Sequence, residues 1–387
     1  MRLIEFLLAL VLVAIVVLLI GLFLPGQGHV ERSIVIERPA SHVFDLLNSY
    51  KRFSAWSPWA KKDPQATYEF GTAQEGPGAS MSFSSANPDV GTGTWEILES
   101  TPTSLIKMNH KVDGGRSATV SYDILPTDLG VKVTWSYDTD LGMNPINRIR
   151  GLYLDSSIGQ DYQYGLMRLK ALLESSAYAR DYSDLTITRL SLPAQPALKA
   201  SGLVEVYSEA EFPDLGAGVA DTFGKIKTFA DRNKLNITGP AQVLVTLDER
   251  YRLGFDVVVP VDRIDVTARD GVEPITTTEG LYVRAEHTGV RRGVKQVFEK
   301  LQAYATIHGL AFDAAVKQPL QQFVTPAGTE TPEEQTVTAV YLPLLPEGTP
   351  VGLPPLPGMP AAAPGEATPA AEPAAEAPAA EPAPAAG

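Results

Sequence analysis

The sequence has no cysteine among its 387 residues, so disulfide bonds, thiolate metal sites and a cysteine nucleophile are all excluded. Histidine is scarce as well. The five histidines lie at positions 29, 42, 110, 287 and 308 and form no cluster with nearby carboxylates that would suit a metal ion. We therefore expect no zinc enzyme, no metal site and no cofactor.

Recognisable catalytic motifs are missing too. The chain has no G-x-S-x-G nucleophile elbow, no phosphate-binding glycine loop and no H-E-x-x-H pair. Carboxylate pairs occur, but no motif places them for catalysis. We therefore assign no catalytic residue. The sequence leaves open whether the protein is an enzyme and favours a binding protein.

Basic clusters are also absent, and the chain is acidic. The formal net charge is −13, and five of the negative charges belong to glutamates of a C-terminal segment that has no lysine or arginine. The remainder of the chain carries −8 and has no basic patch. Nucleic acid is excluded as a partner, because its phosphates require a positive footprint on the protein.

One long apolar run is the most informative feature that is present. The 19 residues from Phe6 to Leu24 carry no charge. As a helix they would span roughly 28 Å, close to the hydrocarbon thickness of a bilayer. Backbone groups in lipid must be satisfied within a helix or a closed barrel, so the run predicts one membrane-spanning helix. We assign residues 1–27 as an N-terminal membrane anchor.

A cleaved secretory signal is the alternative interpretation of this run. The apolar region of a signal is about 7–15 residues long and ends at a small-x-small site. This run is longer and is followed by Pro25-Gly26-Gln27-Gly28. Arg2 precedes it, and the first basic residue after it is Arg32. The positive-inside rule then predicts a single-pass protein of the bacterial inner membrane, with its body in the periplasm rather than the cytoplasm.

At the other end, residues 346–387 are mostly Pro, Ala, Gly and Glu with few large apolar side chains. Such a segment cannot bury enough surface to offset the entropy of ordering. We predict a disordered, locally polyproline-like tail that acts as a solvating spacer, with a docking motif as the alternative.

Residues 28–177 are predicted to form a first domain of one strand, a helix, several antiparallel strands and a long helix. Val30–Glu37 alternates like a strand, and the closing helix carries apolar residues at helical spacing from Ile158 to Leu173. Strand-like segments lie between them, at 79–84, 93–98, 104–111, 118–125 and 131–137. The long helix has to cover the curved sheet, and the two would enclose space between them.

This segment resembles the START-like, polyketide cyclase/dehydrase (SRPBCC) superfamily with its helix-grip fold. The resemblance is carried by RSIVIERPASHVFDLLNSYKRFSAWSPW and by the terminal helix. It implies a cavity of the kind that holds lipids, hormones or polyketides, and it does not imply any one chemistry.

Residues 184–345 contain an internal repeat and are predicted to form a second domain. Phe223, Lys225, Ile226, Phe229, Ala230 and Leu235 match Phe298, Lys300, Leu301, Tyr304, Ala305 and Leu310, all at one offset of 75. Each helix follows a strand and precedes two more, so the unit strand–helix–strand–strand occurs twice. A pair of such units leaves a groove at its junction, where ligands are often bound.

The second domain is similar to the gyrase-inhibitor-like (AraC-type) effector-binding domain of multidrug-sensing regulators. The similarity rests on Glu286-His287-Thr288-Gly289 and on the closing stretch that begins at Pro319. That family usually has a glutamate and then a tyrosine in its groove, and the matching positions here are Gln321 and Phe323. Neither ionises, so the groove should prefer neutral ligands or be vestigial. A one-residue slip would place Gln322 there, which is also uncharged.

The helix-turn-helix module of those regulators is not found in the sequence. A START-like domain and a membrane helix lie where that module would lie. The resemblance therefore does not imply a transcription factor.

The candidate ligand-binding residues are mostly aromatic: Trp56, Trp59, Trp95, His110 and Trp135 in the first domain, and Tyr282, Gln321 and Phe323 in the second. Each has a structural alternative. The alternative role of the tryptophans is to pack a loop or the core, and that of the histidine is to hydrogen-bond within its strand. The facing of Tyr282 stays open, because a slip of one residue reverses the faces of a strand.

Together these patterns predict an α+β protein with a transmembrane helix, a helix-grip domain, a duplicated effector-binding domain and a disordered tail. The favoured function is binding of small apolar or aromatic, lipid-like ligands through two tandem cavities at a membrane. One alternative is a hydrolase or cyclase acting in the first cavity. The other is a ligand-responsive regulator without its own DNA-binding module.

Overall fold

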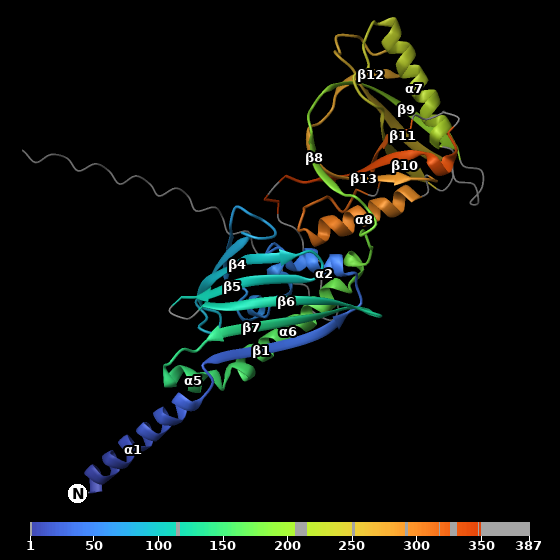
Figure 1. Ribbon diagram of the computed structural model, residues 1–387. Coiled ribbons are helices and arrows are strands. Elements are labelled where there is room, and N and C mark those ends of the chain that lie inside the picture. The colour runs from blue at the N-terminus through green and yellow to red at the C-terminus, as the bar shows by residue number, and fades with distance from the viewer. Residues whose placement is uncertain are drawn as a thin grey trace, which may run out of the picture.

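The computed structural model describes residues 2–113, 117–205, 215–249, 252–290, 293–316, 318–325, 331–346 and 348–349. Figure 1 shows an N-terminal helix, a first sheet with a long helix across it, and a second sheet with two helices. The two antiparallel sheets and the mixed helix and sheet content confirm the predicted fold class. The domain boundaries given above stay predictions, and the predicted tail beyond residue 349 lies outside the described residues.

The N-terminal helix α1 (Arg2–Phe23) contains the apolar run. Within the described part of the chain, it is the one helix long and apolar enough to cross a membrane, as a span or as a signal sequence. Its large side chains are exposed along its length, from Ile4 to Phe23. A helix with apolar residues on every side needs an apolar surrounding.

The first sheet, called here the N-terminal sheet, has seven antiparallel strands in the order β1-β7-β6-β5-β4-β3-β2. Alternate residues of the strands are buried, so one face is apolar and the other faces solvent. The strands are β1 (Gln27–Ile36), β2 (Thr67–Phe70), β3 (Ser80–Ser84), β4 (Thr92–Thr101), β5 (Leu105–Val112), β6 (Ser117–Thr127) and β7 (Gly130–Asp140).

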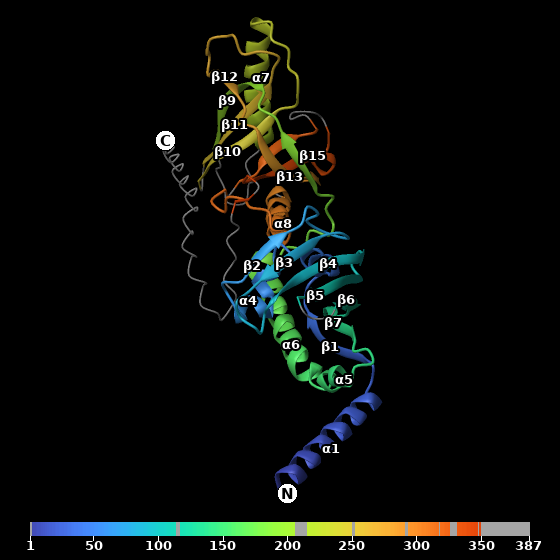
Figure 2. The same cartoon turned by 90° about the vertical axis from the view of Figure 1, so that its left-hand side faces the viewer.

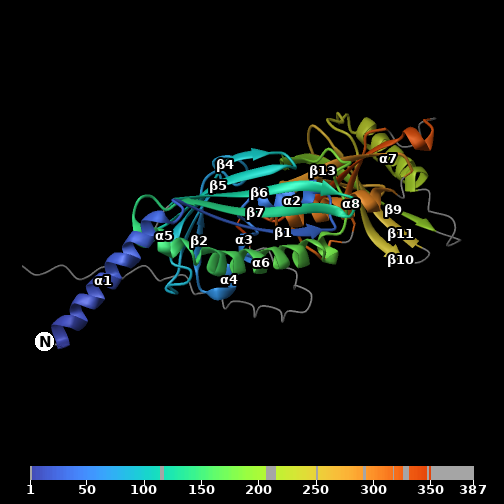
Figure 3. The same cartoon turned by 60° about the horizontal axis from the view of Figure 1, so that its bottom comes forward.

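Five helices belong to the same part of the chain: α2 (Ala40–Leu47), α3 (Phe53–Trp56), α4 (Pro58–Lys62), α5 (Pro145–Gly151) and α6 (Leu154–Leu173). Figure 3 shows α6 running along the sheet near β1 and β7. Two glycines of α6 allow this approach. A Cβ on Gly165 would lie 2.8 Å from Cζ3 of Trp135, and one on Gly159 would collide with the guanidinium of Arg32.

The second sheet, called here the C-terminal sheet, has eight strands in the order β12-β9-β11-β10-β14-β15-β13-β8. The predicted duplication is confirmed. Strands β9, β11 and β10 mirror β13, β15 and β14, and the two sets meet where β10 pairs with β14. Each set has one helix. The elements are β8 (Thr188–Leu192), β9 (Pro196–Glu205), α7 (Leu215–Arg232), β10 (Gln242–Glu249), β11 (Arg252–Pro260), β12 (Val272–Thr276), β13 (Gly280–Thr288), α8 (Val294–Ile307), β14 (Leu320–Phe323) and β15 (Val337–Leu344).

Helix α8 joins the two sheets through a shared apolar core. One side of α8 packs on the C-terminal sheet with Phe298 and Leu301. Its other side presents Ala303 and Ile307, which are buried in the same cluster as the core of the N-terminal sheet. Figure 2 shows α8 between the two sheets. The two halves of the molecule therefore share buried surface at this helix.

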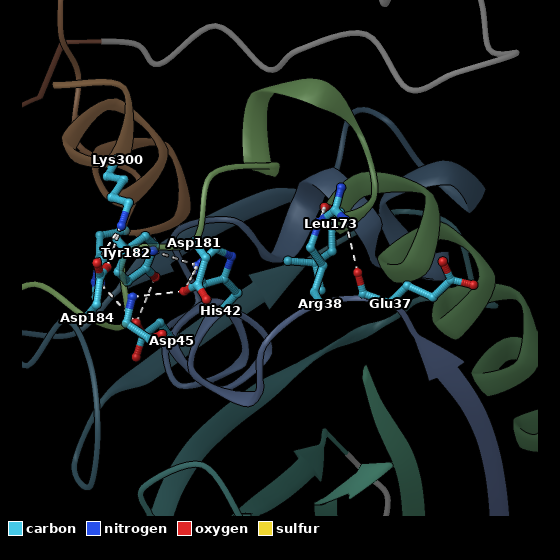
Figure 4. Close-up of polar contacts among 11 residues, drawn as sticks. Glu37, Arg38, His42, Asp45, Leu173, Asp181, Tyr182, Asp184 and Lys300 are labelled. Atoms are coloured by element: carbon cyan, nitrogen blue, oxygen red, sulfur yellow. Dashed lines mark hydrogen bonds and ion pairs between the residues drawn. The ribbon is translucent and has the colours of Figure 1, made fainter. Parts of the chain in front are cut away.

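A ring of polar contacts surrounds this apolar contact, part of it shown in Figure 4. Tyr182 stacks on the ring of His42, with centroids 4.3 Å apart, and donates from its hydroxyl to Asp45 over 2.8 Å. Lys300 of α8 lies 2.6 Å from Asp184. Arg52 is buried and donates to the backbone oxygen of Thr306 at the end of α8 over 2.9 Å.

His308, which follows α8, is the titratable centre of this interface. Its Nδ1 lies 3.2 Å from a carboxylate oxygen of Glu75, and its Nε2 lies 3.5 Å from one of Asp45. Burial alone would lower the pKa of His308, but the two carboxylates outweigh burial and raise it. The hydrogen bond with His308 in turn lowers the pKa of Glu75 to about 2, and Arg189, 3.5 Å away, acts in the same direction.

We expect the contact between the two sheets to be strongest at mildly acid pH. The contribution of His308 is complete below its unfolded pKa near 6.5 and is lost as the pH rises through its raised folded pKa. The contribution of Glu75 is complete above about 4.5 and is lost as the pH falls towards its folded pKa. Urea unfolding midpoints of the wild type should therefore fall between pH 6 and 8.5, and His308→Gln should flatten that fall. An equal fall in both proteins would contradict the assignment to His308.

A pair of glycines tests how closely α6 must approach the sheet. Gly165→Leu should lower the free energy of unfolding by about 1–3 kcal/mol, because the new side chain meets Trp135 and Pro58. Gly224→Leu in α7 is the matched control. A Cβ there has nothing within 4 Å, so the better helix propensity should raise the free energy by up to about 1 kcal/mol. Urea unfolding followed by far-ultraviolet circular dichroism measures both. Equal effects of the two substitutions would contradict the packing given for α6.

Candidate functional site

A cavity of about 550 Å³ lies between the N-terminal sheet and α6. Aromatic rings dominate its lining, and they come from α3, α4, five strands and α6. They are Phe53, Trp59, Tyr68, Phe83, Trp95, His110, Tyr137 and Tyr162. Each strand residue points inwards because alternate positions of its strand face the helix.

The register of the sheet builds the densest part of this wall. Trp95 of β4 lies directly opposite His110 of β5, and the two rings stack with centroids 4.0 Å apart. Trp59 lies 5.6 Å from Trp95 and is held at the start of α4, where the Ser57 side chain accepts a hydrogen bond from its backbone N–H. Such ring pairs contribute about 0.5–1.5 kcal/mol beyond the burial of their area.

Uncharged polar groups also line the cavity, among them His110, Tyr68 and Tyr162. Burial lowers the pKa of His110 to about 4, so its imidazole is neutral at pH 7. Burial also raises the pKa of the Tyr68 and Tyr162 hydroxyls. Both hydroxyls are buried and have no hydrogen-bond partner among the described residues. Each costs about 1–3 kcal/mol if it stays unsatisfied, so a ligand oxygen or a water that reaches it would be favourable.

The charged residues of the lining are partly engaged with each other. Lys62 of α4 pairs with Asp161 of α6 at 2.7 Å, and this ion pair ties the two helices together beside the cavity. Over the part of the chain that is described, His110 has no hydrogen bond or ion pair with a carboxylate, and no group of three metal-ligating side chains could hold an ion. The cavity can thus enclose an apolar or aromatic body and offer it a few neutral hydrogen-bonding groups.

Three of the five residues predicted for the first domain line the cavity: Trp59, Trp95 and His110. Trp56 and Trp135 lie in the core behind it, with ring centroids 5.5 Å apart. Trp135 in turn stacks on Tyr162 at 3.8 Å, so it supports a lining residue without lining the cavity itself. Tyr68 was missed because β2 has only four residues and gives no alternation signal. Tyr162 was visible as part of the apolar stripe of α6.

The residues predicted for the second domain lie apart from this cavity. Tyr282 lines a separate groove of about 770 Å³, beside Arg189, Lys51 and Phe70 of both halves of the molecule. Gln321 and Phe323 are buried in β14, and Phe323 packs in the core under α7. Their role as ligand residues stays a prediction.

Gln322, the residue that a one-residue slip in the match to the effector-binding family would place in the groove, has a polar partner. Its side chain accepts a hydrogen bond of 2.5 Å from the hydroxyl of Tyr341. That hydroxyl also accepts one of 3.2 Å from Arg284, which pairs with Glu286. Gln322, Tyr341, Arg284 and Glu286 therefore form a connected polar chain on the C-terminal sheet.

Among solved structures, several share partial similarity with this chain. The complex of EcmrR with DNA has 11% identity over 51% of this chain and 71% of that one, at a TM-score of 0.35. The EcmrR C-terminal domain has 9% identity over 42% and 98%, at 0.32. Protein CV1439 from Chromobacterium violaceum has 16% identity over 38% and 99%, at 0.28.

No curated protein matches the sequence. The family model described as polyketide cyclase / dehydrase and lipid transport matches residues 27–174. These are the residues from β1 to the end of α6, which enclose the aromatic cavity. The resemblance predicted from the sequence is therefore confirmed for this part of the chain: residues 27–174 have the SRPBCC cavity fold, which suggests ligand binding in general.

Proposed function

We propose that the cavity between the N-terminal sheet and α6 binds one small apolar or aromatic, lipid-like molecule, and that α1 holds the protein in a membrane. The cavity itself is the observation that carries the proposal. It combines about 550 Å³ of space with eight aromatic side chains in its lining. Ligand sites are commonly apolar concave spaces of this size with a few polar groups that fix orientation.

The polar groups of the cavity narrow the class of ligand. His110 is neutral at physiological pH, and Tyr68 and Tyr162 offer hydroxyls without partners. A ligand with a ring or chain and one hydroxyl or carbonyl group would satisfy such hydroxyls while its apolar part covers the rings. A strongly charged ligand would lose its hydration without a matching countercharge among these groups.

For the C-terminal sheet we propose a weaker ligand site or an interaction scaffold. The Gln322–Tyr341–Arg284–Glu286 chain satisfies its own hydrogen bonds. A ligand there would have to replace bonds already formed.

An enzyme of the hydrolase or cyclase class is the second candidate, and one observation favours it. His110 is a buried, neutral imidazole with a strongly lowered pKa inside the cavity, as expected for a functional group. A pKa of about 4 is low for a general base working near pH 7. Binding without chemistry is therefore the better supported function.

Filling the cavity should abolish binding. Ile158→Trp places an indole into the lining, and the affinity for the apolar fluorescent probe N-phenyl-1-naphthylamine should fall about tenfold or more, which corresponds to about 1.4 kcal/mol. Ile237→Trp is the matched control, because Ile237 is partly exposed in the other half of the chain. Fluorescence titration of the full-length protein measures both. Unchanged affinity in Ile158→Trp, with the fold retained, would exclude this cavity as the site.

The pH dependence of binding should report on His110. Its lowered pKa keeps the His110 imidazole uncharged from pH 8 to about 5.5, so probe affinity should be constant over that range and fall as the pH approaches 4. The same group makes the fold less stable there, because the unfolded histidine binds a proton below about 6.5 and the folded one only near 4. In His110→Phe, which can keep the stack on Trp95, the fall in affinity near pH 4 should shrink. A wild-type midpoint near pH 6.5 would show that the imidazole is not desolvated.

A further inference from the structure

The short helix α5 is fastened to the end of the apolar helix α1. Gly21 makes the approach feasible, since a Cβ there would lie 2.7 Å from Cβ of Pro145. Arg148 of α5 donates from one guanidinium nitrogen to the backbone oxygens of Leu22 (2.7 Å) and Leu24 (3.0 Å). These are carbonyls that a helix leaves unpaired at its C-terminus, and a cation suits the negative end of its dipole. Figures 1, 2 and 3 all show α5 beside this end of α1.

Beside this attachment lies a surface that we call the collar, formed by Met143, Ile146, Arg150, Leu152 and Tyr153. Its apolar side chains are unusually open to solvent: Met143 is 78% exposed, Ile146 50%, Leu152 62% and Tyr153 67%. Scattered exposed apolar residues are ordinary. Here four of them occur within the eleven residues from Met143 to Tyr153, and this stretch lies beside the end of the apolar helix α1.

The charge of this segment is the reverse of the charge of the whole chain. From Leu141 to Leu154 the charged residues are Arg148 and Arg150, with no aspartate or glutamate, in a protein of net charge −13. Apolar side chains mixed with arginine and an interfacial tyrosine are the composition of segments that lie in the headgroup layer of a membrane.

We propose that the collar lies in the headgroup layer of the membrane that holds α1 and contacts anionic lipids. The attachment of α5 to α1 fixes the collar at the level where the apolar run ends at Leu24, which is where the hydrocarbon layer ends if α1 spans it. The occupant of this surface is therefore the bilayer that surrounds α1.

The collar also places the ligand cavity close to the lipid surface, and this step rests on the proposed function. Leu152 and Tyr153 directly precede α6, and Ser156 and Ser157 in the first turn of α6 line the cavity. Both serine hydroxyls donate to the backbone oxygen of Tyr153, at 2.9 and 3.0 Å. The cavity is thus built on the membrane-side half of α6, and an amphiphile drawn from the bilayer is the class of ligand that this position favours.

The absence of cysteine allows a direct test with the full-length protein. Single cysteines at Met143→Cys, Ile146→Cys and Tyr153→Cys are labelled with a nitrobenzoxadiazole dye. The protein is reconstituted into vesicles of phosphatidylcholine with a minor share of phosphatidylglycerol, and quenching by a doxyl-labelled lipid is measured. Val16→Cys in α1 is the reference within the bilayer. Leu129→Cys is the exposed apolar control, since it lies at the far end of β7 from α5, roughly 35 Å away.

We expect quenching at the three collar positions to be severalfold stronger than at Leu129→Cys. Vesicles without phosphatidylglycerol, or the additional change Arg150→Gln, should weaken quenching at Ile146→Cys and leave Val16→Cys unchanged. Collar labels that are quenched as weakly as the label at Leu129→Cys would overturn the proposal. A collar that is covered by another protein would give this result. Tryptophan fluorescence checks folding, because all four tryptophans lie in the N-terminal half. If α1 does not enter the bilayer, the label at Val16→Cys will not be quenched. If the cavity does not bind ligand, N-phenyl-1-naphthylamine will not bind. Failure of the collar proposal can therefore be told apart from failure of the anchor and from failure of the cavity.

Discussion

The distance between α6 and the N-terminal sheet is the constraint on which the rest of the structure depends. Tyr162 stacks on Trp135 at 3.8 Å, and Gly165 leaves no room for a side chain against the same tryptophan. The helix therefore lies close to β1 and packs on the Trp135 side chain of β7, where the rings are fully buried. The cavity lies on the side of this contact towards β2, where residues of β2 to β5 line it. A space of about 550 Å³ departs from the close packing of the core beside it, as a binding cavity does.

Sequence patterns predicted the elements better than the surfaces they form. The offset of 75 between Phe223 and Phe298 predicted two equivalent units, and the mirrored strand order confirms them. Such periodicity reports on local structure. Whether an inward-facing tryptophan lines a cavity or fills a core depends on how close a helix lies above it. Trp95 and Trp135 have the same alternation in their strands, yet one meets the cavity and the other meets Tyr162.

The interface at α8 was beyond reach from the sequence for a related reason. More than two hundred residues of the sequence separate His308 from Glu75 and Asp45, and no local pattern links the three. The amphipathic stripe of α8 predicted one buried face. Ala303 and Ile307 form a second, small face that is buried only because the N-terminal half lies against it. A helix with two partners has more buried positions than a surface helix, and in a single sequence this excess is hard to tell from an ordinary apolar stripe.

Helix α6 connects three features that would otherwise be separate. Its first turn follows the collar and supplies lining residues to the cavity, and its last turn leads through Tyr178 to the residues that contact α8. Packed interiors have low compressibility and transmit strain. Tyr162 of this helix lines the cavity and stacks on Trp135, so the cavity wall and the core of the N-terminal sheet form one packed unit. Because Ala303 and Ile307 of α8 are buried in the same cluster as the N-terminal sheet, this packed unit extends into the second half of the chain.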